Sequence, residues 1–90
     1  MNGARLLLVD DEEGIRTVLS LVLADMGHDV RTAANGNEAL ARLHDRPADV
    51  VLTDVRMPGM DGLALLAAVR EAWPDTGVIM LTGHGDMELA

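Results

Sequence analysis

The stretch Asp49-Val-Val-Leu-Thr-Asp54-Val-Arg-Met-Pro-Gly-Met-Asp-Gly62 decides the fold. It opens with three consecutive apolar residues, Val50 to Leu52, a pattern typical of a strand that is buried on both faces of a parallel sheet. Asp54 stands where that strand should end, at the edge where open α/β sheets gather ligands and chemistry. A carboxylate at this position is predicted to be either a nucleophile or a cation ligand.

Strand-length segments and helical periodicity alternate through the rest of the chain. Further strands are expected at 6–9, 29–33 and 78–81, and between the strands apolar residues recur at helical spacing. The expected core-facing positions are Ile15, Val18, Leu19, Val22, Leu23 and Met26 in the first helix, Ala39, Leu40 and Leu43 in the second, and Leu63, Leu66, Val69, Ala72 and Trp73 in the third. Another helix is expected to begin at Asp86.

This order of elements predicts an α/β fold with a doubly wound parallel sheet, right-handed crossovers and helices on both faces. The chain has 90 residues, enough for one domain at most. In such a sheet the ligand crevice lies outside the carboxyl ends of the strands. Asp10-Asp11, Asp54 and Thr82 follow three of the four expected strands, so these polar groups are predicted to converge.

Composition narrows the function. The net charge is −8, which disfavours direct binding to nucleic acid or to an anionic membrane. The sequence has no Cys, and no stretch approaches the roughly 18 apolar residues of a membrane span. We therefore expect a cytoplasmic protein. All seven cationic side chains are Arg, so no Lys is available to balance an acidic site.

The predicted acidic corner needs a counter-charge. Two carboxylates about 4 Å apart repel by about 4 kcal/mol at an effective dielectric constant near 20. Either protonation or a bound cation must relieve this, and oxygen ligands suit Mg²⁺. Asp10 or Asp11, Asp54 and a backbone carbonyl of the following loop could supply the ligands. A structural interpretation of residues 10–13 is a helix N-cap followed by first-turn acids. It is compatible with the cation site, since Asp11 can cap the first helix while Asp10 points into the crevice.

Other polar and aromatic residues are predicted to have structural roles. Asp61 is expected to cap the third helix, and Trp73 to anchor the core. Met57 is predicted to pack rather than to bind a cofactor. We expect His28 to be solvated and His44 to face away from the crevice.

Three motifs together resemble the receiver domain of bacterial two-component response regulators. They are Leu-Leu-Leu-Val-Asp-Asp-Glu at 6–12, Thr-Asp-Val-Arg-Met-Pro-Gly-Met-Asp-Gly at 53–62 and Met-Leu-Thr-Gly-His-Gly at 80–85. The resemblance implies that residues 1–90 form a single flavodoxin-like receiver domain, C-terminally incomplete, with strand order 2-1-3-4 and the fifth strand absent. Residues 81–87 further resemble receivers of activators that work with sigma factor 54.

The resemblance also implies a role for each site residue. Asp54 would accept a phosphoryl group from a phosphohistidine on a sensor histidine kinase. Asp10, Asp11, Asp54 and the backbone carbonyl of Arg56 would hold Mg²⁺, and Thr82 with Gly83 would bind the phosphoryl group as a switch. Such a chain is a signalling domain, not an enzyme, and controls an output such as transcription through a further domain.

Two features leave alternatives open. The resemblance implies a Lys in the fifth strand that pairs with the phosphoryl group, and these 90 residues contain no Lys. This absence favours a switch-dead interaction module with the same fold. A small Mg²⁺-dependent phosphohydrolase is a weaker third hypothesis. The strand at 78–81 lacks both Pro and Lys and would form the edge of a truncated sheet. Because such an edge pairs with other chains, we expect self-association.

Overall fold

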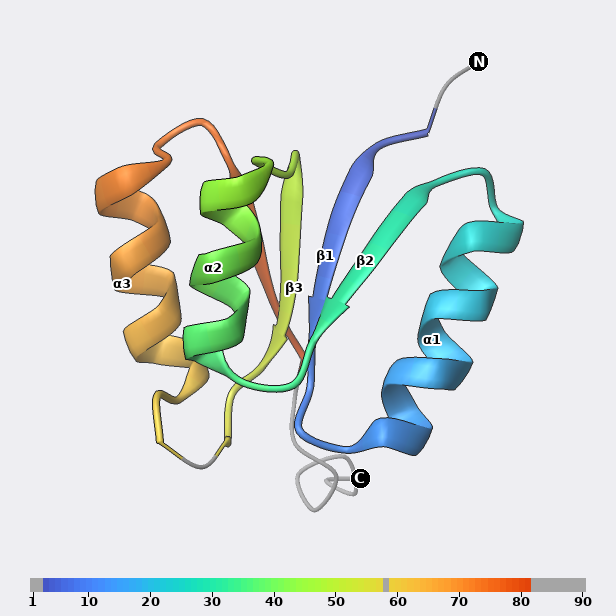
Figure 1. The fold of residues 1–90 in the computed structure, drawn as a ribbon, viewed down its shortest axis with the longest axis horizontal. Helices are drawn as coiled ribbons and strands as arrows, with labels where there is room; N and C mark the ends of the chain where they lie inside the picture. Colours follow the sequence, from blue (N-terminus) through green and yellow to red (C-terminus); the bar gives the residue numbers. More distant parts are fainter. Residues whose placement is uncertain (1–2, 58, 82–90) are drawn as a thin grey trace, which may run out of the picture.

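The computed structural model describes residues 3–57 and 59–81. In chain order its elements are β1 (Arg5–Val9), α1 (Glu13–Asp25), β2 (Asp29–Ala33), α2 (Gly36–Asp45), β3 (Val50–Asp54), α3 (Gly62–Ala72) and β4 (Gly77–Leu81). The strands are parallel and lie in the order β2-β1-β3-β4 (Figure 1). This confirms the predicted doubly wound sheet. The helix expected from Asp86 lies outside the described residues.

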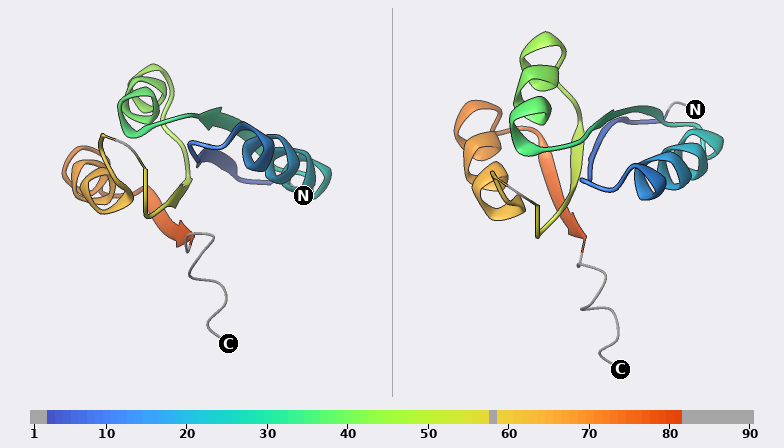
Figure 2. Two further views of the ribbon diagram at one scale, coloured as in Figure 1. Left: turned by 90° about the horizontal axis from the view of Figure 1, so that it is seen from below. Right: turned by 60° about the horizontal axis from the view of Figure 1, so that its bottom comes forward.

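The helices cover the two faces of the sheet unequally. α2 and α3 lie on one face and α1 lies on the other (Figure 2). α1 packs against β2 and β1, at one side of the sheet. No helix of the described part is long and apolar enough to cross a membrane.

The main core lies between the sheet and the pair α2 and α3. Its buried members are Leu7, Val9, Ala33, Ala39, Leu43, Ala48, Val51, Met57, Leu65 and Val69. Leu7 of β1 stands beside Val51 of β3 in the parallel register, and Leu43 of α2 joins the same cluster. The packing roles predicted for Leu43 and Met57 are therefore confirmed.

The core-facing stripe of α3 differs from the predicted one. Leu65 and Val69 are fully buried, whereas Leu63 is 60% exposed and Ala72 is exposed. The prediction was wrong for Leu63 and Ala72 because leucines at 63, 65 and 66 allow two stripes. The structure selects the stripe that starts at the buried Gly62, where α3 meets β3.

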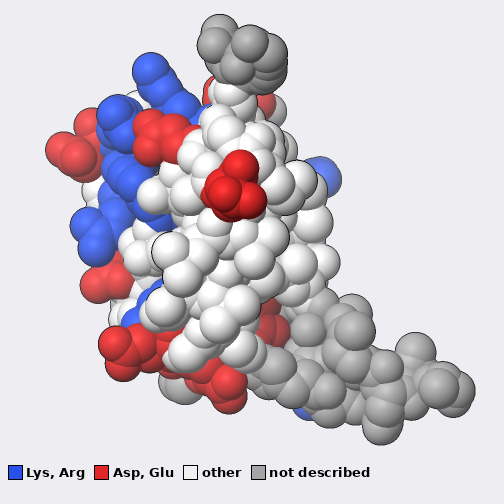
Figure 3. Space-filling model, turned by 90° about the vertical axis from the view of Figure 1, so that its right-hand side faces the viewer, with Lys and Arg blue, Asp and Glu red and all other residues white. Residues whose placement is uncertain are grey.

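The apolar stripe of α1 is much less buried than its periodicity predicts. No residue of α1 is fully buried, and Val18 and Val22 are 59% and 50% exposed. Figure 3 looks onto the α1 side and shows a band of uncharged residues between charged groups. In the described part α1 packs mainly against β2 and also against β1, and periodicity alone does not report how much of its apolar face these strands cover.

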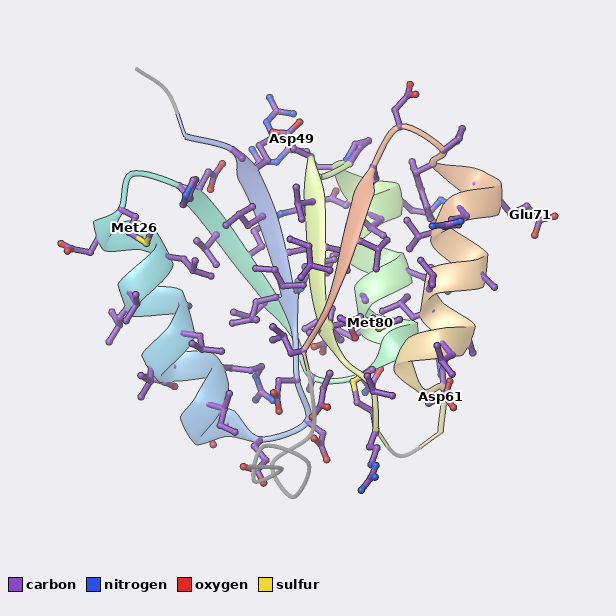
Figure 4. All side chains as sticks on the ribbon, turned by 180° about the vertical axis from the view of Figure 1, so that it is seen from behind. Met26, Asp49, Asp61, Glu71 and Met80 are labelled. Atoms are coloured by element: carbon purple, nitrogen blue, oxygen red, sulfur yellow. The ribbon has the colours of Figure 1, made fainter. Side chains whose placement is uncertain are left out.

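β4 begins at Gly77 and is only partly buried. Ile79 is 51% exposed. It pairs with Leu52, on the face of the sheet opposite α2 and α3. Figure 4 shows this face, over which no helix of the described part covers β3 and β4. The expectation that the strand at 78–81 forms an edge of the sheet is therefore confirmed for the described residues.

Candidate metal centre

Two neighbouring strands bring the predicted acids together. Asp10 directly follows β1 and Asp54 ends β3, and these strands are adjacent and parallel. Asp10 and Asp54 are each only 3% exposed, while Asp11 is exposed. Each of the three offers a carboxylate oxygen, and these oxygens lie within 4.8 Å of one another. The predicted convergence of Asp10, Asp11 and Asp54 is thus present in the fold.

The chain around Asp10 fixes its orientation. Its Oδ1 accepts a hydrogen bond from the backbone N–H of Glu12 at 2.9 Å. Nη1 of Arg16 donates to the carbonyl oxygen of Asp10 at 2.7 Å. The first bond ties the acid to the start of α1, and the second brings a permanent cation behind the acidic group. Sequence reasoning missed Arg16, although its place in the first turns of α1 was a usable signal.

The structure does not place Asp11 at the N-cap of α1, where the sequence allowed it. The N-cap of α1 is Glu12, whose side chain makes no capping hydrogen bond. Asp10 supplies the carboxylate that accepts from the Glu12 N–H. Asp11 is therefore not the cap, and its carboxylate joins the acidic group instead.

Asp54 is held by the loop that follows it. Its Oδ1 accepts from the backbone N–H of Arg56 at 3.3 Å. The loop then returns to β3, where the N–H of Gly62 donates to the carbonyl oxygen of Val55 at 2.9 Å. A hollow of about 440 Å³ beside the loop is lined by Val55, Arg56, Met57 and Asp61. The residues that line this hollow come from the loop and not from the acidic group.

The predicted cap of α3 is confirmed. Oδ1 of Asp61 accepts from the N–H of Ala64 at 2.9 Å, in the usual geometry of an N-cap. Figure 4 shows Asp61 near the carboxyl ends of the strands and Asp49 at their opposite end. Asp61 therefore lies on the same side of the sheet as the acidic group, but its Oδ1 is engaged in capping.

The three acids fit a hard divalent cation. Carboxylate oxygens are the ligands that Mg²⁺ prefers, and it commonly uses one or two of them and keeps several waters. The buried pair Asp10 and Asp54 would be costly to leave without a counter-charge. The ligand role of the Arg56 carbonyl remains a prediction. Thr82 and Gly83, the predicted switch residues, lie outside the described residues.

The histidines in the described part lie apart from this group. The ring of His44 makes an edge-to-face contact with Trp73, with centroids 4.9 Å apart, so His44 faces α3 rather than the acids. Trp73 packs on the core but is only partly buried. The expectation that His28 is merely solvated was wrong, because its Nδ1 accepts from the N–H of Ala4 at 3.0 Å. That bond ties the start of β2 to the start of β1.

Comparison with known proteins agrees with this geometry. Residues 6–90 match the family model described as the response regulator receiver domain. The chain is 48% identical over 83 residues to the DNA-binding transcriptional regulator NtrC of Salmonella typhimurium, covering 92% of this chain and 18% of that protein. It is 42% identical, with the same coverage, to the C4-dicarboxylate transport transcriptional regulatory protein DctD of Rhizobium meliloti.

Solved structures give the same result. A crystal structure of NtrX from Brucella abortus in complex with ADP superposes with a TM-score of 0.87 at 41% identity, over 96% of this chain and 20% of that chain. The chemotaxis protein CheY4 of Vibrio cholerae superposes with a TM-score of 0.84 at 37% identity, over 96% and 76%. The chain spans only 18% of the length of the transcriptional regulators named above. It belongs to the family of response regulator receiver domains of two-component systems.

Proposed function

We propose that Asp54 is the phospho-acceptor of this receiver and takes its phosphoryl group from a phosphohistidine on a sensor histidine kinase. The observation that carries the proposal is the meeting of Asp10, Asp11 and Asp54 at the carboxyl ends of β1 and β3. Membership of the receiver family supports it. The domain is a signalling module in this proposal, not a turnover enzyme.

The transfer needs little from the protein beyond placement. A carboxylate oxygen of Asp54 forms a bond to phosphorus while the P–N bond of the phosphohistidine breaks, and the imidazole nitrogen leaves with the electron pair. The Arg56 N–H holds one oxygen of the carboxylate and thereby limits its rotation. Burial of Asp54 limits the access of bulk water to its carboxylate before the transfer.

We further propose that Asp10, Asp11, Asp54 and the carbonyl of Arg56 hold Mg²⁺. The bound ion neutralises charge on the phosphoryl oxygens and on the crowded carboxylates. Asp10 is fixed for this role by its bonds with Glu12 and Arg16. In the same proposal Thr82 and Gly83 bind the phosphoryl oxygens after transfer.

In this proposal the effect of phosphorylation is carried out by an output domain. The relatives NtrC and DctD are transcriptional regulators, so we propose that this receiver controls transcription through an output domain. The resemblance of residues 81–87 to receivers of sigma-54-dependent activators points to that class of output. A cytoplasmic location and the absence of direct contact with nucleic acid or membrane remain predictions.

Phosphorylation of the purified chain tests the proposal. Acetyl phosphate with Mg²⁺ should add one phosphoryl group, measured by intact mass, and Asp54→Asn should abolish the addition. Asp75→Asn is the matched control, because Asp75 is an exposed acid in the loop between α3 and β4. Labelling that survives Asp54→Asn but not another substitution would place the acceptor elsewhere.

A second candidate is a receiver-like module that binds partners without phosphorylation, because none of these 90 residues is a Lys that could donate a charge-assisted hydrogen bond to a phosphoryl oxygen. Such a bond contributes about 1.5–3 kcal/mol, so these 90 residues by themselves should be phosphorylated weakly or not at all. Mg²⁺ binding without any phosphoryl uptake from acetyl phosphate or a phosphorylated kinase would favour this module. Repeated turnover of a phosphomonoester would instead favour the phosphohydrolase.

A further inference from the structure

Gly62 makes an unusually close contact with the backbone at the site. It is the first residue of α3, is buried, and donates its N–H to the carbonyl oxygen of Val55 at 2.9 Å. A Cβ atom on Gly62 would lie 2.3 Å from the carbonyl oxygen of Asp54 and 2.9 Å from Cα of Val55. Both neighbours are backbone atoms, which cannot rotate away as a side chain can.

Gly36 shows what is special about this contact. Gly36 is the first residue of α2, as Gly62 is of α3, and it is also buried. The three atoms nearest to a Cβ on Gly36 would be Sδ, Cγ and Cβ of the Met60 side chain, at 2.7–2.8 Å. Sδ and Cγ belong to the flexible part of Met60, whereas its Cβ moves only with the backbone of that loop residue. A methyl group at the start of α2 therefore pushes on Met60, whereas one at the start of α3 pushes directly on the backbone of Asp54 and Val55.

The backbone that a methyl group on Gly62 would contact includes that of Asp54, a member of the acidic group. Asp54 contributes its carbonyl oxygen to the contact with Gly62 and its carboxylate to the acidic group. Mg²⁺ demands near-ideal octahedral geometry from its ligands. A displacement of the Asp54 backbone that admits a methyl group would move the Asp54 carboxylate relative to those of Asp10 and Asp11.

From this contact we propose that Gly62 is a positioning residue for the Mg²⁺ and phosphoryl site. Its missing side chain lets α3 close onto the end of β3, and this closure fixes Asp54 and the start of the loop that contains Arg56. The inference rests on the proposed function. It adds a residue that touches neither ion nor phosphoryl group and acts through the backbone of Asp54.

Calorimetric titration of Mg²⁺ into Gly62→Ala and three controls is the test. Gly14→Ala adds a methyl group where nothing lies within 4 Å, and Gly36→Ala adds one against Met60. Gly3→Ala creates a still closer backbone contact, with the Gly27 carbonyl oxygen, away from the acids. We expect about 10- to 100-fold weaker Mg²⁺ binding in Gly62→Ala alone. Urea unfolding of all four variants separates lost affinity from lost stability.

A second readout needs no metal. In metal-free protein, the ¹³C signal of the Asp54 carboxylate and the amide signal of Arg56 should move in Gly62→Ala and stay in place in Gly14→Ala. Full Mg²⁺ affinity in a folded Gly62→Ala variant, or an unmoved Asp54 signal, overturns the inference. If the wild-type chain binds no Mg²⁺, the metal assignment fails, and the Asp54 signal alone decides the role of Gly62.

If Gly62→Ala does not fold, a hydrogen-exchange experiment on the wild-type protein tests the role of Gly62. Because coupling is reciprocal, an ion that needs the closed junction must also hold it closed. Hydrogen exchange of the Gly62 amide, bonded to Val55, should slow when Mg²⁺ is added. The Trp73 amide, bonded to Val69 at the other end of α3, is the control. Equal slowing of both amides, or of neither, contradicts the proposed role.

Discussion

Oδ1 of Asp10 and the backbone N–H of Glu12 are joined by a 2.9 Å hydrogen bond, so one carboxylate serves both the acidic group and the start of α1. Asp10 is the first residue after β1, and Glu12 is the N-cap of α1. Because the Glu12 side chain makes no capping bond, Asp10 is a principal support of this junction. The charge of Asp10 and its hydrogen bond can be separated by substitution.

We expect Asp10→Asn to be more stable than Asp10→Ala by about 1 kcal/mol in Mg²⁺-free buffer. Both variants lose the charge, but only Asn keeps an oxygen that can accept from the Glu12 N–H. Both should bind Mg²⁺ more weakly than the wild type. Urea unfolding followed by circular dichroism measures the difference in stability, and calorimetry measures the affinity. Equal stabilities of the two variants would show that the bond contributes nothing measurable.

Asp54→Asn should change stability in opposite directions with and without Mg²⁺. Without the ion, the substitution removes repulsion from Asp10 and Asp11 and should raise the free energy of unfolding by about 1–4 kcal/mol, the range between a water-like dielectric constant and an effective value near 20. At a hundredfold excess over its Kd, Mg²⁺ should stabilise the wild type by about 2.7 kcal/mol and the variant by less. Thermal unfolding with and without Mg²⁺ shows whether the order of stability of the wild type and the variant reverses.

Asp75→Asn is the control for this Mg²⁺-dependent change in stability, since Asp75 is an exposed acid outside the acidic group. Its effect should be small and nearly the same with and without Mg²⁺. A wild-type unfolding temperature that does not respond to Mg²⁺ would argue against the metal site itself.

Leu65→Ala and Leu63→Ala should differ strongly although the two leucines are two residues apart. Leu65 is fully buried against the core, so its truncation should cost about 2–5 kcal/mol. Leu63 is 60% exposed, and its truncation should change the free energy of unfolding by about 0.5 kcal/mol or less. Chemical denaturation of the two variants decides whether α3 has the orientation that the structure gives it.

The comparison of these leucines shows where sequence reasoning fails. The apolar run that ends at Asp54 correctly predicts β3, and the alternation of strands and helices correctly predicts that Asp10, Asp11 and Asp54 meet at one edge of the sheet. The orientation of α3 could not be predicted, because Leu63, Leu65 and Leu66 satisfy two helical stripes equally well. The contact of Gly62 with the Asp54 backbone, which no spacing rule describes, accompanies the observed choice.

A second limit concerns how much of a helix is covered. Periodicity reports that Val18 and Val22 share a face of α1, but it does not report how wide the surface beneath that face is. In the structure α1 rests on β1 and β2, and these valines remain half-exposed. His28 illustrates the same limit for polar groups, because its hydrogen bond to the Ala4 amide joins segments that are 24 residues apart.

The last prediction is that the 90-residue chain self-associates through β4. In the described sheet β4 is the outer strand beside β3, and Ile79 is 51% exposed on it. An apolar outer strand without Pro or Lys offers unpaired backbone groups to a second copy. Light scattering across a concentration series should show mass rising above that of a monomer. Ile79→Lys should reduce the association, because a charge opposes strand pairing, whereas Leu63→Lys, on α3, should not. A monomer at every concentration, or equal effects of the two substitutions, would rule out this edge as the contact.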